Sequence, residues 1–192
     1  MKRVGIITMH RVQNYGSVLQ AYATQWIIEK MGYECEIIDY QYPNEWQYQR
    51  GVKRPIYTWK NYLAEKFQLR PFWRWKHKLD YFIGHYLHLS EFYDSPDALL
   101  KCPPKYDIYV TGSDQVWNPL HTKGDLSFLL DFVKAKEKIA YASSFATDVL
   151  NEDCKKQFKL LLQEYKSISV REKGGQRIIR ELTGKEVPVV LD

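Results

Sequence analysis

The stretch VGIITMHRVQNYGSVLQAYATQWIIEKMGYECEIIDY, Val4–Tyr40, decides the fold. Val4–Met9 is a short apolar run typical of a buried strand, and Tyr33–Tyr40 predicts a second strand. Between them apolar residues recur at helical spacing, and Gly32 stands where a helix C-cap glycine belongs. A strand, a helix and a strand in this order predict a right-handed βαβ unit with parallel strands.

A second junction between strand and loop lies in YDIYVTGSDQVWN, Tyr106–Asn118. An alternating apolar strand runs here into Gly-Ser-Asp, and open α/β sheets bind ligands at the carboxyl ends of their strands. Gly112 would let the backbone approach a ligand, with Ser113 beside it, and Trp117 would supply a flat wall. Asp114 either orients or deprotonates a substrate hydroxyl or caps the turn that follows.

The rest of the chain alternates strands with helices. This order predicts an α/β, Rossmann-like fold with a mainly parallel sheet and helices on both faces. At 192 residues the chain suits one well-buried domain. The sequence stops after a last strand, so we expect a truncated or split chain, with a natural edge strand as the alternative. The expected elements are strands at Lys138–Ser143, Ile168–Val170 and Glu186–Asp192 and helices at about Glu152–Tyr165 and Gly174–Leu182.

A block at about 41–104 differs from the rest and is interpreted as a helical insertion. Apolar and aromatic residues follow helical spacing over Ile56–Phe67 and Phe72–Tyr86, and Pro55 and Pro71 stand where helices would start. We expect two helices that form a cap or flap over the sheet.

This insertion also holds the positive charge of the chain. From Arg50 to Lys78 there are nine Lys or Arg residues against the single acid Glu65, while the remainder is slightly acidic. A basic, aromatic block fits nucleic acid, an anionic membrane surface or an acidic sugar chain. It also fits solvated helix faces whose aromatic residues pack inward.

Several functional classes are disfavoured by the sequence. No stretch is long and apolar enough to span a bilayer and the start reads as a strand rather than a leader, so we expect a cytoplasmic protein. Cys35, Cys102 and Cys154 indicate neither a disulfide framework nor a zinc site. His85 and His88 lack a carboxylate pattern beside them, and there is no GxGxxG motif or P-loop. We expect no metal and no organic cofactor.

Four motifs resemble those of one family. NYGSVLQAYA (Asn14–Ala23), GSDQVWN (Gly112–Asn118), ASSFA (Ala142–Ala146) and SVREKGG (Ser169–Gly175) are similar, in order and spacing, to motifs of the polysaccharide pyruvyl transferase family. The resemblance covers nearly the whole chain but only the N-terminal half of the family's usual length. It implies two Rossmann-type domains facing a cleft, as in B-type glycosyltransferases. Residues 1–192 would be the first domain, with the C-terminal domain absent.

The resemblance also implies a reaction. Members of this family transfer the enolpyruvyl group of phosphoenolpyruvate, as a ketal, to two hydroxyls of a sugar in a bacterial surface or secreted polysaccharide, and phosphate is released. The partners implied are this donor and a glycan or lipid-linked sugar acceptor, which favours an anionic membrane over nucleic acid as the surface met by the basic insertion. The donor site would fall in the other half, so this chain alone would be inactive. The alternatives are a nucleotide-sugar glycosyltransferase of similar architecture and a non-catalytic binding or assembly module.

Such chemistry needs an acid, a base and fixed cations for carboxylate and phosphate. Arg171, at the end of a strand, suits the cationic task, or it forms an ion pair with its neighbour Glu172, the third catalytic candidate beside Asp114. Ser143 and Ser144 either line the same cleft or pack as small residues.

The first turn between strand and helix supplies further candidates. Asn14, Tyr15, Gly16 and Ser17 would offer backbone N–H groups to an anion or a sugar oxygen, or would serve as a cap and tight turn. His10 is either an acid or base or a loop histidine, and Gln20 is expected to face solvent. We expect the loops 14–17, 112–114 and 171–172 to converge along one rim.

Overall fold

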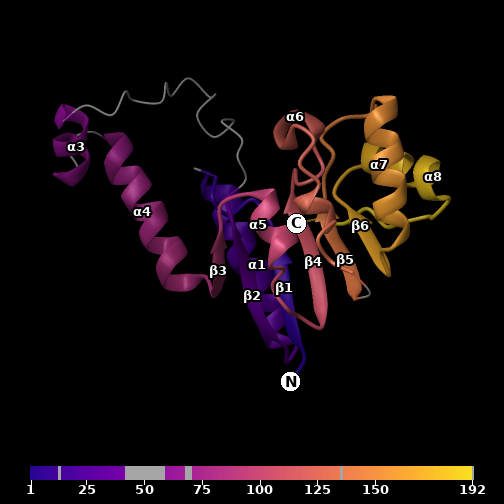
Figure 1. Cartoon of the computed structure of the whole chain (residues 1–192), viewed down its shortest axis with the longest axis horizontal. Coiled ribbons are helices and arrows are strands. Elements are labelled where there is room, and N and C mark those ends of the chain that lie inside the picture. Colours follow the sequence, from indigo (N-terminus) through magenta and orange to yellow (C-terminus); the bar gives the residue numbers. More distant parts are fainter. Residues whose placement is uncertain (13, 42–58, 68–70, 135, 192) are drawn as a thin grey trace.

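The fold is built on a six-stranded sheet in which every neighbouring pair of strands is parallel, in the order β3-β2-β1-β4-β5-β6 (Figure 1). The computed structural model describes residues 1–12, 14–41, 59–67, 71–134 and 136–191. The predicted α/β, Rossmann-like class is confirmed. The strands are β1 (Arg3–Ile7), β2 (Glu34–Tyr40), β3 (Leu89–Tyr93), β4 (Ile108–Asp114), β5 (Glu137–Ser143) and β6 (Ser167–Val170).

Helices cover both faces of this sheet. One apolar cluster joins Val18 of α1 and Leu79 of α4 to Ile37 of β2, and the second joins helices on the other face to Ile38 and Tyr109. Adjacent residues of a strand point to opposite faces, so Ile37 and Ile38 separate the two layers. The helices are α1 (Tyr15–Lys30), α3 (Trp59–Lys66), α4 (Pro71–Tyr86), α5 (Pro96–Lys101), α6 (Pro119–Thr122), α7 (Glu152–Gln163) and α8 (Lys173–Thr183), with a 3-10 turn η1 (Ser127–Leu129).

The predicted βαβ unit is present. The side chain of Asn14 caps α1 by accepting the backbone N–H of Gly16, and the helix ends at the C-cap Met31. Gly32 follows with a φ of +87°, the left-handed conformation that glycine adopts without steric cost. Strands β1 and β2 then pair in parallel, with Val4 opposite Cys35.

The inserted block differs from the flap expected over the sheet. It contributes β3 at the edge of the sheet as well as α5, and α4 packs on the sheet face beside α1 through the buried Leu79 and Ile83. Helix α4 begins at Pro71 as predicted, whereas Pro55 lies outside the described residues. Helix α3 lies beyond the end of α4 that is farther from β3 (Figure 1).

The expected last strand is also different. Of Glu186–Asp192, Val189 forms a single parallel bridge with Val170, and the N–H of Val190 donates to the carbonyl of Val170 at 2.9 Å. Pro188 interrupts the donor series because proline has no backbone N–H. Residue 192 lies outside the described part of the chain.

Candidate functional site

The three loops expected to form one rim meet at Asp114. They lie at the carboxyl ends of the strands, the upper edge of the sheet in Figure 1. The hydroxyl of Ser17 donates to Oδ2 of Asp114 at 2.5 Å, and Nη1 of Arg171 lies 4.0 Å from Oδ1. Residues nearly one hundred positions apart in sequence therefore form one polar cluster, which we call the Asp114 cluster: Ser17, Asp114 and Arg171.

Asp114 caps the turn that follows it, as one of its two interpretations expected, and it also contacts a hydroxyl group. Its Oδ1 accepts the backbone N–H of Gln115 at 2.7 Å, so the carboxylate does cap its own turn. Its other oxygen faces Ser17, and the side chain is 18% exposed. The residue has a φ of +88°, a left-handed conformation that costs energy in a residue other than glycine and is often found at functional sites.

Trp117, Ser143 and Ser144 do not line a cleft. Trp117 is fully buried and its Nε1 donates to the carbonyl of Phe128 at 3.2 Å, so the expected flat wall for a ligand is wrong. Ser143 is also fully buried, and its hydroxyl donates to the carbonyl of Thr111. Ser144 is 1% exposed and its hydroxyl accepts a backbone N–H. The alternative interpretation, in which these two serines pack as small residues, fits the structure.

Gly112 and Glu172 also have structural tasks. The close approach at Gly112 is to β5, because a Cβ there would lie 2.2 Å from the carbonyl oxygen of Tyr141. Glu172 accepts the backbone N–H of Phe145 at 2.9 Å and so holds the loop after β5. A catalytic role for Glu172 has no support in this geometry.

In the turn at Asn14–Ser17, one residue caps α1 and another contacts Asp114. Asn14 caps α1, and Tyr15 is half exposed, with its ring centroid 5.9 Å from that of Trp75 in an edge-on arrangement. Gly16 is exposed, and Ser17 is the residue of this turn whose side chain reaches Asp114. Ser113 is buried on the β4 side, where its Oγ accepts the N–H of Asp114 at 2.6 Å.

A buried cluster at the ends of β1 and β2 was not predicted. His10 is fully buried, with Nε2 3.1 Å from Oδ1 of Asp39 and Nδ1 3.1 Å from the carbonyl of Thr8. Asp39 accepts two further hydrogen bonds, from Nε of Arg11 at 2.7 Å and from Nη2 at 2.5 Å. Burial acts to raise the pKa of Asp39, but the hydrogen bonds from His10 and Arg11 and the charge of Arg11 outweigh it and hold the pKa below its ordinary value. The structure thus fits the second description of His10, a loop histidine, in a turn after β1 where both ring nitrogens have partners.

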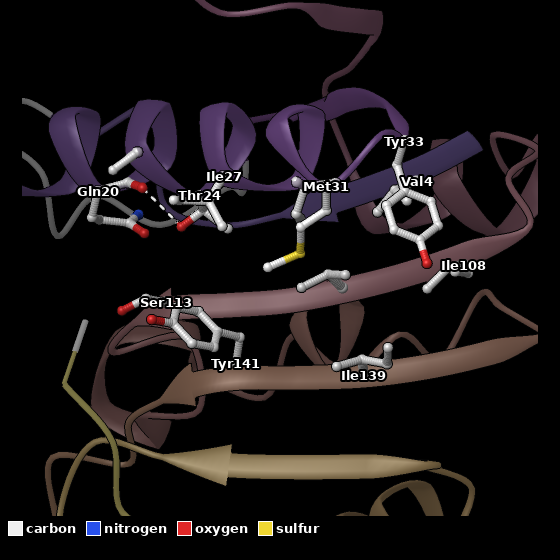
Figure 2. A pocket seen from close by; sticks show the side chains of 13 residues that line it. Val4, Gln20, Thr24, Ile27, Met31, Tyr33, Ile108, Ser113, Ile139 and Tyr141 are labelled. Carbon is white, nitrogen blue, oxygen red and sulfur yellow. Dashed lines mark hydrogen bonds between the residues drawn. The ribbon is translucent and has the colours of Figure 1, made fainter. Parts of the chain in front are cut away.

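A pocket of about 460 Å³ lies beside α1, over β1, β4 and β5 (Figure 2). Gln20, Ser113 and Tyr141 stand at its polar end, towards the carboxyl edge, and apolar side chains such as Ile108 and Ile139 line the rest. Of the predicted site residues, Ser113 lines this pocket.

Gln20 does not face solvent as expected. Its Nε2 donates to the hydroxyl of Thr8 at 2.8 Å and to the carbonyl of Ser17 at 3.0 Å. Its Oε1 is buried and has no hydrogen-bond partner among the described residues, so it is available to a ligand hydroxyl. The sequence signal that could have indicated this inward orientation is the position of Gln20, one helical turn after Gly16.

The described residues show neither a metal site nor a membrane span. Within the part of the chain that the structure describes, no three His, Cys, Asp or Glu side chains are grouped so that they could hold a metal ion. Across the same residues no helix combines the length and apolarity needed to cross a bilayer.

Comparison with known families supplies the assignment. The model of the polysaccharide pyruvyl transferase family matches residues 14–192. The chain belongs to this family. The matched range contains all four motifs, and the family implies a transferase. Among curated proteins and solved structures there is no match to the chain.

Proposed function

We propose that the chain forms the acceptor side of an enzyme that transfers the enolpyruvyl group of phosphoenolpyruvate to a sugar of a bacterial surface or secreted polysaccharide. The product is a ketal across two sugar hydroxyls, and phosphate is released. The observation that carries the proposal is the Asp114 cluster at the carboxyl edge of the sheet, in a chain that belongs to this family.

The reaction defines what the cluster would have to do. Protonation of the donor's methylene carbon makes C2 cationic, a sugar hydroxyl then attacks C2, and its proton leaves to a base. Attack by the second hydroxyl at the same carbon displaces phosphate and completes the ketal, with loss of a second proton. The protonation needs an acid, the two attacks need a base, and the anionic groups need fixed positive charge nearby.

Asp114 is the proposed base. Its Oδ2 already receives the O–H of Ser17 at 2.5 Å, which shows the direction from which a hydroxyl proton reaches this oxygen. A sugar hydroxyl that replaced Ser17 in this hydrogen bond would have its proton aimed at Oδ2 while its oxygen stayed free to attack. Arg171, 4.0 Å from the other carboxylate oxygen, would place positive charge beside the anionic donor.

Phosphate release from phosphoenolpyruvate by the full-length protein, measured with and without a glycan acceptor, tests the proposal. We expect release that depends on the acceptor, and a glycan product that carries a new ketal methyl signal in NMR spectra. Release of a nucleoside diphosphate from a nucleotide sugar, with phosphoenolpyruvate left intact, would replace the proposal by a glycosyltransferase. No turnover of either donor would favour a binding or assembly module.

A second proposal concerns the inserted helices, which we expect to contact an anionic membrane surface. On α3 the side chain of Trp59 is 69% exposed, and Phe67, directly after this helix, is 62% exposed. Lys60 and Lys66 lie among them on the same short segment. Exposed aromatic rings beside lysines favour an interfacial contact over helix faces whose aromatic residues all pack inward.

A further inference from the structure

We propose that Arg11 forms an oxyanion-binding site at the carboxyl ends of β1, β2 and β3, with Asp39 and His10 as positioning residues. The site would take a carboxylate or a phosphate group. Its assignment to the substrate of pyruvyl transfer rests on the proposed function, whereas the anion site itself stands on the geometry of these three residues.

The position of Arg11 follows from the topology of the sheet. Arg11 comes after β1, Asp39 lies at the end of β2, and Phe92 lies near the end of β3, so neighbouring parallel strands bring all three to one edge. This is the edge at which open α/β sheets bind ligands. Three strand ends converge on one guanidinium group.

The guanidinium of Arg11 is fixed on one side and open on the other. Its Nε and Nη2 donate to the two oxygens of Asp39, and its carbon Cζ lies 5.8 Å from the ring centroid of Phe92. Within the described part of the chain, Nη1 makes no hydrogen bond, and the side chain is 29% exposed. A planar fork held in this way offers its free N–H groups to two oxygens of an anion with little further loss of side-chain freedom.

The buried residues His10 and Asp39 hold this guanidinium in place. Both ring nitrogens of His10 face oxygens that act as acceptors, the carbonyl of Thr8 and the carboxylate of Asp39. His10 therefore holds Asp39 from the buried side, and the exposed part of this group is the guanidinium of Arg11.

Thr8 connects this group to Ser113, the residue before Asp114. The carbonyl of Thr8 faces His10, and the hydroxyl of Thr8 donates to the carbonyl of Ser113 at 2.9 Å, one residue before Asp114. An anion held by Arg11 would therefore lie on the β1 side of the proposed base, at the same edge. Phosphoenolpyruvate or an acidic sugar of the acceptor would supply such an anion.

Isothermal titration calorimetry of the chain at constant ionic strength tests the site. The probes are inorganic phosphate, phosphoenolpyruvate and glucuronate, with glucose as the neutral comparison. The change Arg11→Gln is set against Arg3→Gln, a matched control. Arg3 is the first residue of β1, the strand that precedes Arg11, and so lies at the opposite edge of the sheet. It pairs with Glu36, and its Cζ lies 5.2 Å from the ring centroid of Tyr106.

We expect the wild type and Arg3→Gln to bind at least one of the anions alike and glucose not at all. Arg11→Gln should weaken that binding about tenfold to a hundredfold, because hydrogen bonds to charged groups contribute at that level. Arg11→Lys, which keeps the charge and loses the fork, should fall between them. Preference for phosphoenolpyruvate or for glucuronate identifies the donor or the acceptor as the source of the anion.

Equal binding by Arg11→Gln and the wild type, or no anion binding by the wild type, would overturn the proposal. If circular dichroism shows that Arg11→Gln does not fold, because Asp39 loses its partner, then Arg11→Lys and the pair Arg11→Gln with Asp39→Asn decide the question on the same criterion. Anion binding without turnover of phosphoenolpyruvate would reject the proposed function and leave the anion site in place.

Discussion

At the scale of single residues, Asp114 is held from several directions at once. Ser17 donates from α1, the backbone of Gln115 donates from the following turn, and Arg171 approaches from the end of β6. A φ of +88° in a residue other than glycine costs about 1–3 kcal/mol and persists where surrounding contacts over-determine it. This pre-organisation is what a base aimed at one hydroxyl requires.

The change Asp114→Asn tests this role directly. The amide has nearly the same shape but cannot take a proton, so kcat/KM for phosphate release should fall by about 100-fold to 10,000-fold in the full-length protein. The unfolding midpoint should stay near that of the wild type. Asp107→Asn is the matched control because Asp107 precedes the other end of the same strand, where its Oδ2 accepts the N–H of Arg3. Wild-type turnover in Asp114→Asn would remove the base from the proposal.

Trp117 should act on stability and not on binding. In Trp117→Phe the indole N–H to the carbonyl of Phe128 is lost, but that carbonyl keeps the hydroxyl of Thr111 as a donor at 2.7 Å. We therefore expect the free energy of unfolding to drop by about 1–2 kcal/mol, from the lost bond and a small cavity. Denaturant titration measures this loss, and KM for the acceptor should not change. A raised KM at unchanged stability would restore Trp117 as a ligand wall.

At the scale of elements, sequence periodicity predicts the helices and strands that are stabilised by contacts between neighbouring residues. The β1-α1-β2 unit is visible in the sequence because its helix caps and apolar spacing are neighbours along the chain. Strand β3 was missed because Leu89–Tyr93 is a half-exposed edge strand with little alternation, and its pairing with β2 joins residues about fifty positions apart.

The exposed lysines of the inserted helices allow a test of the proposed membrane contact. Neutralising Lys60 and Lys66 of α3 together with Lys78 of α4 to Gln should weaken binding to anionic vesicles, measured by flotation, about 100-fold, because each lysine near such a surface contributes about 1 kcal/mol. Neutral vesicles should bind neither form. The matched control neutralises Lys134 and Lys136, exposed in the loop before β5, and Lys159, exposed on α7. Vesicle binding that persists unchanged in the first triple variant would rule out this contact.

At the scale of the whole molecule, the candidate site is assembled by the sheet. The motifs predicted the Asp114 cluster because each lies at the end of a strand, and parallel strands bring those ends to one edge. The His10, Arg11 and Asp39 group escaped prediction because its residues belong to no recognised motif. Burial, which decides the roles of Trp117 and Ser143, depends on the packing of other helices and is not visible in spacing alone.

Low pH should reduce the free energy of unfolding through protonation of Asp39. The pKa of Asp39 is lowered below its ordinary 3.8 in the folded protein by His10 and Arg11, despite the opposing effect of burial. Its ionised form therefore adds stability that is complete above the unfolded pKa and is lost as the pH falls through the folded pKa. The difference in unfolding free energy between the wild type and Asp39→Asn should be largest near neutral pH and shrink towards about pH 3 in urea titrations. Asp80→Asn, at an exposed carboxylate paired with Lys76, controls for general destabilisation by acid. A difference in unfolding free energy that stayed constant over this pH range would mean that His10 and Arg11 do not stabilise the ionised form of Asp39.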